Sequence, residues 1–146
     1  MGNYNATARS NYVRVKNLAE VRRLLAERAP EITICESHKN PGHVAFLVSG
    51  MSDTGCWPSI FPTDEEGNID DDQVPEEFGD FIAPHLEEGE VLILVEAGAE
   101  KLRYVAGWAR AVRVRNGAVE SLTVSLDDIY TAVRRQWKID PTAATY

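Results

Sequence analysis

The chain has 146 residues, 44% of them hydrophobic, and its 23 Asp and Glu outnumber its 15 Lys and Arg, for a formal net charge of −8. A chain of this length and composition can form a hydrophobic core without a disulfide or a structural metal. An isoelectric point near 4.9 disfavours direct binding to nucleic acid, and the longest apolar runs fall far short of the roughly 18 residues that cross a bilayer.

The compartment and the extent of the folded domain follow from the same features. The N-terminus has no basic-then-apolar leader, and the two cysteines, Cys35 and Cys56, lack metal-ligand spacing. We therefore expect a cytoplasmic protein with free thiols. We expect one domain over residues 11–139, a flexible N-terminus over 1–10 and a frayed tail over 140–146.

The N-terminal half predicts a strand, a helix and two more strands. Alternating valines predict a half-buried strand over 12–16, and an apolar stripe between Asn17 and Pro30 predicts a helix over 17–29 with Asn17 as its cap. Strands over 32–36 and 43–49 follow, joined by a turn. The second is apolar on both faces, which predicts a central position in the sheet.

The middle of the chain is irregular. Residues 50–74 are rich in Gly, Pro, Ser and acids, so we expect a long loop with at most a short strand over 59–61. Pro75 suits the first position of a helix, and the apolar spacing that follows predicts a helix ending at Gly89. Pro84 lies within this segment and should kink or split it.

The C-terminal half predicts three strands and a last helix. An apolar run over 91–95 precedes a turn over 98–100 and a long strand over 102–115, in which Gly107 should mark a bulge or bend. Asn116–Gly117 predicts a hairpin to a strand over 119–124. Ser125 and Asp128 predict a capping box for a helix whose apolar residues should face the core, namely Ile129, Val133 and Trp137.

The predicted order is β-α-β-β, an acidic loop, then α-β-β-β-α. Short hairpins favour a largely antiparallel sheet with about three helices, which is the α+β class. No glycine-rich phosphate loop follows any strand, so the pattern disfavours nucleotide binding.

Cys56 is the strongest candidate nucleophile. The pair Cys56–Trp57 resembles the nucleophile segment of papain-like proteases, but two prolines follow where that family continues into a helix. A thiol-dependent enzyme using Cys56, with His85 or His43 as the base, remains an alternative. The segment 64–70 resembles the middle of an EF-hand loop, yet the first and last ligand positions are missing. We expect no metal and no cofactor.

The charges are segregated along the chain. The 61 residues between Lys39 and Lys101 contain 15 carboxylates and no Lys or Arg, whereas the flanks hold all 15 basic residues and only 8 acids. Such a block is either a solvated face, partly neutralised by Arg103, Arg110, Arg113 and Arg115, or a surface that recognises a basic partner. Segment 64–80 has 9 carboxylates in 17 residues, a density that suits imitation of a phosphate backbone.

Four segments resemble small acidic proteins carried by bacterial plasmids, integrative elements and phages. They are 11–16, 83–91, 98–104 and 125–130. Proteins of this kind include anti-CRISPR and anti-restriction inhibitors, which are small, acidic and free of cofactors. The resemblance implies an inhibitory binding protein and no enzymatic activity.

The sequence therefore favours a counter-defence inhibitor that binds a basic, nucleic-acid-binding host protein or complex, such as a CRISPR effector or a restriction enzyme, and that binds no membrane. A regulatory or structural domain of mobile-element machinery, possible as a homodimer through the Trp108 strand, is a further alternative. The residues expected to contact the partner are Asp64, Glu65, Glu66, Asp70, Asp71, Asp72, Glu76, Glu77, Asp80, Trp57 and Phe61.

Overall fold

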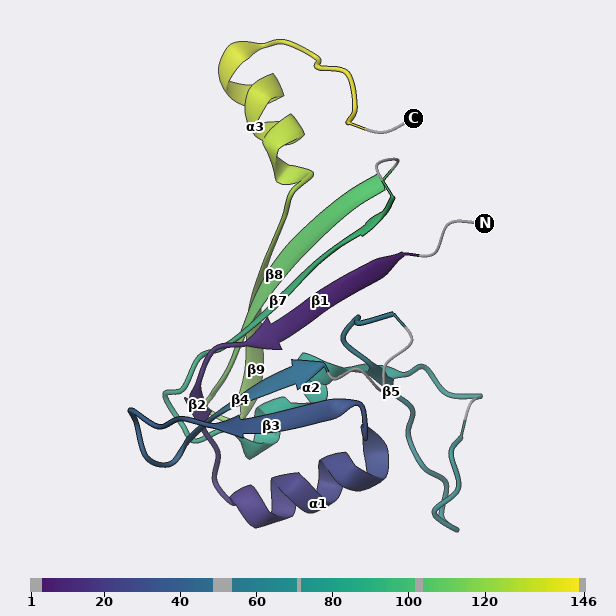
Figure 1. Ribbon diagram of the computed structural model, residues 1–146, viewed down its shortest axis with the longest axis vertical. Coiled ribbons are helices and arrows are strands. Elements are labelled where there is room, and N and C mark those ends of the chain that lie inside the picture. The colour runs from purple at the N-terminus through teal and green to yellow at the C-terminus, as the bar shows by residue number, and fades with distance from the viewer. Residues whose placement is uncertain (1–3, 49–53, 71, 102–103, 145–146) are drawn as a thin grey trace.

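One antiparallel sheet organises the chain. The computed structural model describes residues 4–48, 54–70, 72–101 and 104–144. The sheet strands run in the order β2-β4-β1-β7-β8-β9, with β3 paired to β4 (Figure 1). Their bounds are β1 (Asn5–Ser10), β2 (Val13–Arg14), β3 (Ile32–Glu36), β4 (His43–Val48), β7 (Leu92–Glu100), β8 (Tyr104–Arg115) and β9 (Ala118–Ser125). With three α-helices among the described residues, the predicted α+β class is confirmed.

The flexible N-terminus predicted for residues 1–10 is wrong for residues 5–10, because these form β1. This strand pairs with β7 from Asn5↔Ala99 to Ser10↔Leu94. The small polar residues of β1 have no strong strand preference of their own. Pairing with β7 supplies the backbone hydrogen bonds, so tertiary context overrides local propensity. Residues 1–3 lie outside the described part of the chain.

Two side chains hold the bend between β1 and β2. The pairing with β4 shifts by one residue between Arg9↔Leu47 and Val13↔Val44. At this shift the buried Ser10 hydroxyl accepts from the Phe46 amide at 2.8 Å. The Asn11 side chain makes the two hydrogen bonds that a neighbouring strand would otherwise make. It donates to Val91 O at 3.0 Å and accepts from the Ile93 amide at 2.8 Å.

The first helix, α1 (Leu18–Arg28), forms where the sequence predicted it. Asn17 is its N-cap and accepts from the Glu20 amide at 3.1 Å. The helix buries Val21 and Leu25. β3 matches its predicted range, and β4 matches over 43–48, with residue 49 outside the described residues. β4 is an interior strand, as predicted, since β3 lies on one side and β1 and β2 on the other.

The segment after the acidic loop differs from its prediction. Glu76 and Glu77 form a short strand, β6 (Glu76–Glu77), which pairs with β5 (Ser59–Ile60). The helix predicted to begin at Pro75 therefore begins only at α2 (Phe78–Ile82), because this pairing extends the backbone before it. The predicted split at Pro84 is confirmed, since α2 passes into a single 3₁₀ turn, η1 (Ala83–His85).

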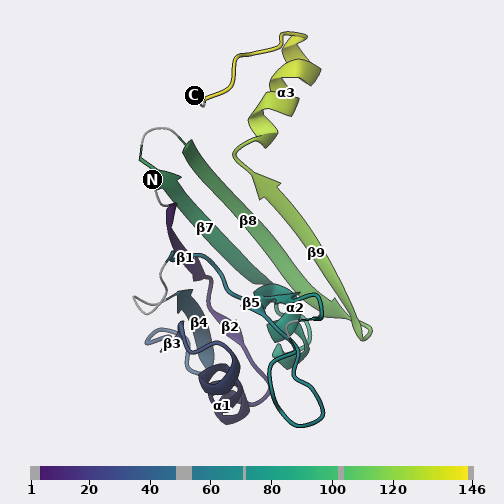
Figure 2. The same ribbon diagram turned by 90° about the vertical axis from the view of Figure 1, so that its right-hand side faces the viewer.

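The core lies between the inner face of the sheet and the helices α1 and α2. Phe46 of β4 packs edge-to-face on Phe78 of α2, with ring centroids 5.6 Å apart. Leu92 and Leu94 of β7 complete it from the sheet. Figure 2 shows that α1 and α2 lie together at one end of the molecule, while α3 lies at the other.

The long hairpin β7–β8 is regular. β7 runs on to Glu100, so the turn predicted at 98–100 is wrong, and the residues that follow it include 102–103, outside the described part. Gly107 pairs with Ala97 in an unbroken register, so the predicted bulge is also wrong. The missing side chain makes room for Leu126, whose Cδ1 would lie 3.2 Å from a Cβ at position 107. The hairpin at Asn116–Gly117 is confirmed, with φ of 52° and 77°.

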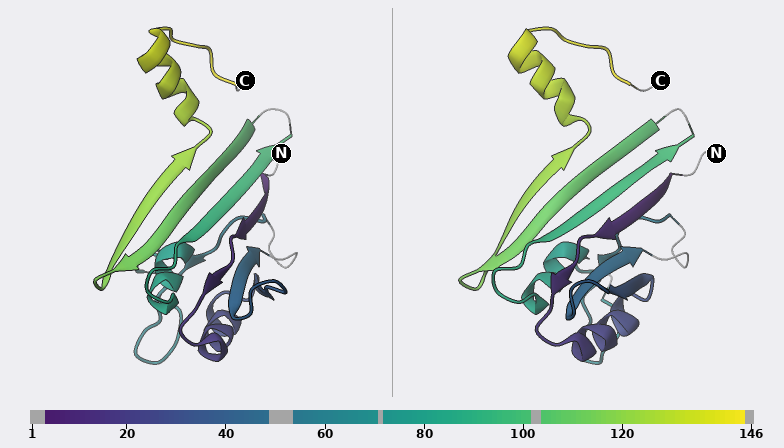
Figure 3. Two further views of the ribbon diagram at one scale, coloured as in Figure 1. Left: turned by 90° about the vertical axis from the view of Figure 1, so that its left-hand side faces the viewer. Right: turned by 60° about the vertical axis from the view of Figure 1, so that its left-hand side comes forward.

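The last helix, α3 (Asp128–Trp137), was predicted to pack its apolar residues against the core, and this prediction is wrong. Asp128 accepts from the Ser125 amide at 2.7 Å, as in the predicted capping box, but no residue of α3 is buried. Ile129 and Trp137 are 61% and 69% exposed. A short connection carries α3 beyond the end of β9, so its apolar stripe has no sheet beneath it (Figure 3).

The described part of the tail, 140–144, forms no helix or strand, and it returns alongside α3. Arg134 pairs with Asp140 at 2.8 Å, and the Ala144 amide donates to the Tyr130 hydroxyl at 2.8 Å. Both contacts are on the exposed surface, where such bonds contribute little stability.

Replacing Ser10 by alanine should lower the free energy of unfolding by about 1–3 kcal/mol, because the buried Phe46 amide loses its acceptor. Urea denaturation measures the change. Ser121→Ala, on the exposed strand β9, is the matched control. Equal stability of the two variants would show that the Ser10 hydroxyl does not hold the bend.

Candidate functional site

The acidic loop, residues 64–72 between β5 and β6, has a defined shape. A backbone bridge joins Thr63 to Ile69 across its base. The Asp64 carboxylate accepts from the amides of Glu66 and Asn68, both at 2.9 Å, and Gly67 adopts the left-handed φ of 84° that the turn requires. Asp70 similarly accepts from the Asp72 amide at 3.2 Å. Local turns and the backbone bridge therefore hold the shape of residues 63–70.

Four carboxylates on or next to this loop are exposed, and their side chains form neither an ion pair nor a hydrogen bond with any described residue, unlike Asp64. They are Glu65, Glu66, Asp72 and Glu76. Asp71, predicted to belong with them, lies outside the described residues. Because nothing described neutralises these side chains, they present a concentrated negative potential to solvent.

Glu77 and Asp80, which were also predicted to contact the partner, have a different role. Arg110 of β8 pairs with Glu77 at 2.9 Å and with Asp80 at 2.8 Å, and its own side chain is only 13% exposed. This arginine joins β6 and α2 to the sheet. Glu77 and Asp80 are therefore largely committed within the fold.

The two predicted aromatic anchors are not neighbours. Phe61 lies beside the acidic loop, where it lines a shallow hollow with Leu24 and Ile69, and its carbonyl accepts from Arg28. Trp57 instead packs inward, stacking on Phe78 with ring centroids 5.1 Å apart. The structure thus brings Phe61 to the acidic loop and takes Trp57 away from it.

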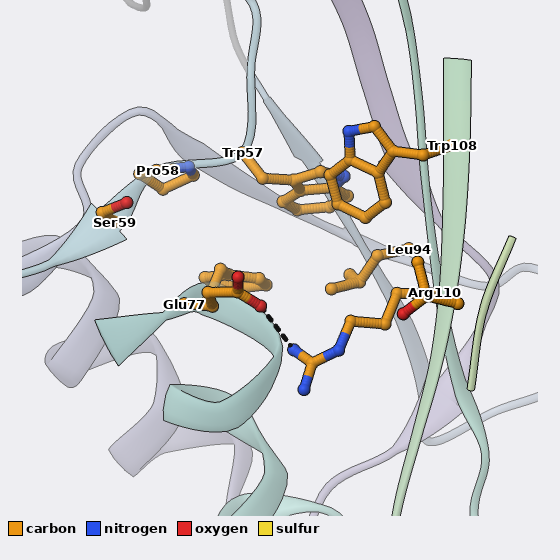
Figure 4. Close-up of a pocket in the computed structure, with 9 residues that line it drawn as sticks. Trp57, Pro58, Ser59, Glu77, Leu94, Trp108 and Arg110 are labelled. Carbon is orange, nitrogen blue, oxygen red and sulfur yellow. Dashed lines mark hydrogen bonds and ion pairs between the residues drawn. The ribbon is translucent and has the colours of Figure 1, made fainter. Parts of the chain in front are cut away.

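Trp57 lines a cavity of about 290 Å³ between the segment 57–59 and the sheet. Trp108 lies next to Trp57 at one end, and the Glu77–Arg110 ion pair closes the other, with Leu94 between them (Figure 4). The Trp57 indole N–H donates to Val95 O at 3.2 Å. The Trp108 indole N–H donates to Glu96, and Arg110 and Glu77 pair with each other, so these four side chains give the cavity aromatic walls and an ion pair.

Glu96 is the buried charge beneath this cavity. It is 7% exposed, and its Oε1 accepts from the Trp57 amide at 2.9 Å while its Oε2 accepts from the Trp108 indole N–H at 3.0 Å. A buried carboxylate is tolerated when N–H donors satisfy it. Partial burial, and then the charge of Glu96, raise the pKa of the Tyr4 phenol above its ordinary value.

The sequence analysis did not single out Glu96, and it named Arg110 only among the arginines that neutralise the acidic block, a role that its ion pairs bear out. The pattern that could have identified them is alternation. In β7, Leu92, Leu94 and Glu96 share the inward face, and in β8 Arg110 stands between the inward-facing Trp108 and Val112. A charged residue in phase with core positions must be paired or hydrogen-bonded inside the fold.

The thiol hypothesis finds no catalytic geometry among the described residues. Cys56 is half-buried, and its amide donates to Thr54 Oγ1 at 3.3 Å. His43 lies with Nε2 4.0 Å from Glu90 Oε1, and neither its ring nor that of His85 is hydrogen-bonded to Cys56. The described residues also hold no cluster of three His, Cys, Asp or Glu side chains that could bind a metal ion.

Comparison with known proteins gives no relative for this chain. No family model matches it, and no match appears among curated proteins or solved structures. None of the helices in the described residues combines the length and the apolar character needed to cross a membrane.

Replacing Glu96 by glutamine should lower the free energy of unfolding by about 1–3 kcal/mol, because an amide NH₂ replaces one of the two accepting oxygens. The N–H that faced this oxygen then has no acceptor. Thermal or urea unfolding followed by tryptophan fluorescence measures the loss. Glu76→Gln, at an exposed position, is the control, and an equally small effect in both would contradict the role of Glu96.

Proposed function

We propose that this protein is a non-enzymatic inhibitor whose acidic loop binds the basic surface of a nucleic-acid-handling complex, such as a CRISPR effector or a restriction enzyme. The observation that carries the proposal is the set of exposed carboxylates that form no ion pair with a described residue. A surface of one sign selects partners of the opposite sign and accelerates their encounter.

The order of the loop adds to this argument. Asp64 and Asp70 hold its backbone through their own amide hydrogen bonds, so less conformational entropy is lost when a partner binds. Phe61 lies at the edge of the loop and is 38% exposed. It supplies an apolar contact beside the charges, which is a common arrangement in protein interfaces.

The proposed partner is basic because it normally holds DNA or RNA. The lysines and arginines that normally neutralise phosphates would instead pair with the carboxylates of residues 64–76. The resemblance of four segments to proteins of plasmids and phages agrees with this role, because such elements meet these complexes in the bacterial cytoplasm. Direct nucleic-acid binding does not fit the same surface, since phosphates and carboxylates repel one another.

The triple variant Glu65→Gln, Glu66→Gln, Asp72→Asn should lose most of its inhibition of DNA cleavage by such a complex. Its binding should also lose its dependence on salt, because fewer charges contribute. Cleavage assays and binding measurements at rising ionic strength, with purified restriction enzymes and CRISPR effectors as probes, test both expectations.

The control removes the same charge elsewhere. Glu20, Glu31 and Glu88 form no ion pair with a described residue, so their replacement by Gln changes the net charge equally and leaves the acidic loop intact. If both triple variants inhibit equally, net charge and not the loop is responsible. If excess nucleic acid fails to displace the native protein, the competitive mechanism is wrong.

A further inference from the structure

The outer face of β7, β8 and β9 is apolar and uncovered beyond the Arg113–Glu120 ion pair, which lies nearer the β8–β9 hairpin. Side chains that pair across neighbouring strands share a face, and the register places Ile93, Ala111 and Leu122 in one row. The next row is formed by Val95, Ala109 and Val124. Leu122 is 77% exposed and Val124 61% exposed, so this face has no covering layer among the described residues.

The sizes of the side chains in register imply a groove along β8. Its floor follows β8 through Ala111, Ala109 and Gly107, which are small, and its walls are larger residues of the two flanking strands. Leu126 closes one end over Gly107. At about 3.4 Å per residue, the floor from 111 to 107 is roughly 14 Å long.

The stripe of α3 has matching dimensions. Ile129, Val133 and Trp137 recur every four residues and lie on one side of the helix. At 1.5 Å per residue, the stripe is about 12 Å long. An apolar helix stripe of this kind is stable when a sheet face or another helix covers it.

The helix cannot lie in the groove of its own chain in this arrangement. Only Leu126 and Asp127 separate β9 from α3, and the Leu126 amide donates to Gly107 O at 2.9 Å. The Ser125–Asp128 hydrogen bond holds the same junction. These bonds direct α3 past the end of the sheet, away from the groove (Figures 1 and 2).

We propose that a second copy of this chain covers the groove, with α3 of each copy lying in the groove of the other. A twofold axis then covers both apolar surfaces of both copies, because each chain carries one groove and one stripe. β9 is also an unprotected edge strand of eight residues, which favours an interface over an isolated surface.

The exposed apolar area is sufficient for such a dimer. Seven large hydrophobic side chains on this part of the molecule are more than half exposed, namely Val105, Leu122, Val124, Leu126, Ile129, Trp137 and Ile139. At roughly 100 Å² each they amount to roughly 700 Å², close to the ~800 Å² per partner of a standard interface.

The first test is the mass of the full chain in solution. Sedimentation equilibrium over a range of concentrations should give twice the chain mass of 16.2 kDa. Leu122→Glu and Trp137→Glu, each at an exposed position, should give folded monomers with an unchanged circular dichroism spectrum. A monomeric native protein at high micromolar concentration overturns the proposal, as does a dimer that both variants retain.

The second test locates the helix. In a background with Cys35→Ser and Cys56→Ser, separately purified Ala109→Cys and Val133→Cys proteins are mixed and oxidised. A disulfide-linked heterodimer is expected, because the groove of one copy meets the helix of the other. Arg135→Cys, on the opposite side of α3, is the control in place of Val133→Cys. A dimer in which Val133→Cys links no better than Arg135→Cys contradicts the exchange of helices.

Discussion

The pairing of β7 with both β1 and β8 is the constraint on which the rest of the structure depends. β1 comes from the first ten residues and β7 from residues 92–100, so this contact joins the two halves of the chain. Contacts so distant in sequence incur a loop-closure cost in entropy, which continuous ladder hydrogen bonds and burial of the inward-facing side chains offset. β7 thereby aligns Leu94 for the core and Glu96 for the cavity.

Glu96 of β7 also attaches the segment 54–60 to the sheet. Its carboxylate joins the Trp57 backbone to the Trp108 side chain, and Gly55, with φ of 76°, passes so close to β1 that a Cβ would meet Ala6 O at 1.8 Å. Segment 54–60 is therefore fixed against the sheet before the chain enters the acidic loop. The acidic loop therefore begins from a segment that the sheet holds in place.

Electrostatics acts in opposite ways in the two parts of the acidic block. Arg110 pairs with Glu77 and Asp80 and so joins β6 and α2 to the sheet, at a position where the arginine side chain is only 13% exposed. The carboxylates of Glu65, Glu66 and Asp72 contribute nothing comparable to folding. Charges that the fold does not use and does not neutralise are the ones available for recognition. The ion pairs of Arg110 bear out the neutralised face for Glu77 and Asp80, while the partner surface stays a prediction.

The sequence by itself determined the elements whose local chemistry is decisive. Asn17 capped α1, Asn116 and Gly117 formed the hairpin because both accept positive φ, and Pro84 ended α2 because it lacks an amide hydrogen. Only the tertiary structure decided the strand β1, the position of Trp57 in the cavity and the exposure of α3. Each of these depends on which distant segment supplies a partner, and periodicity reports that a face is apolar without reporting what covers it.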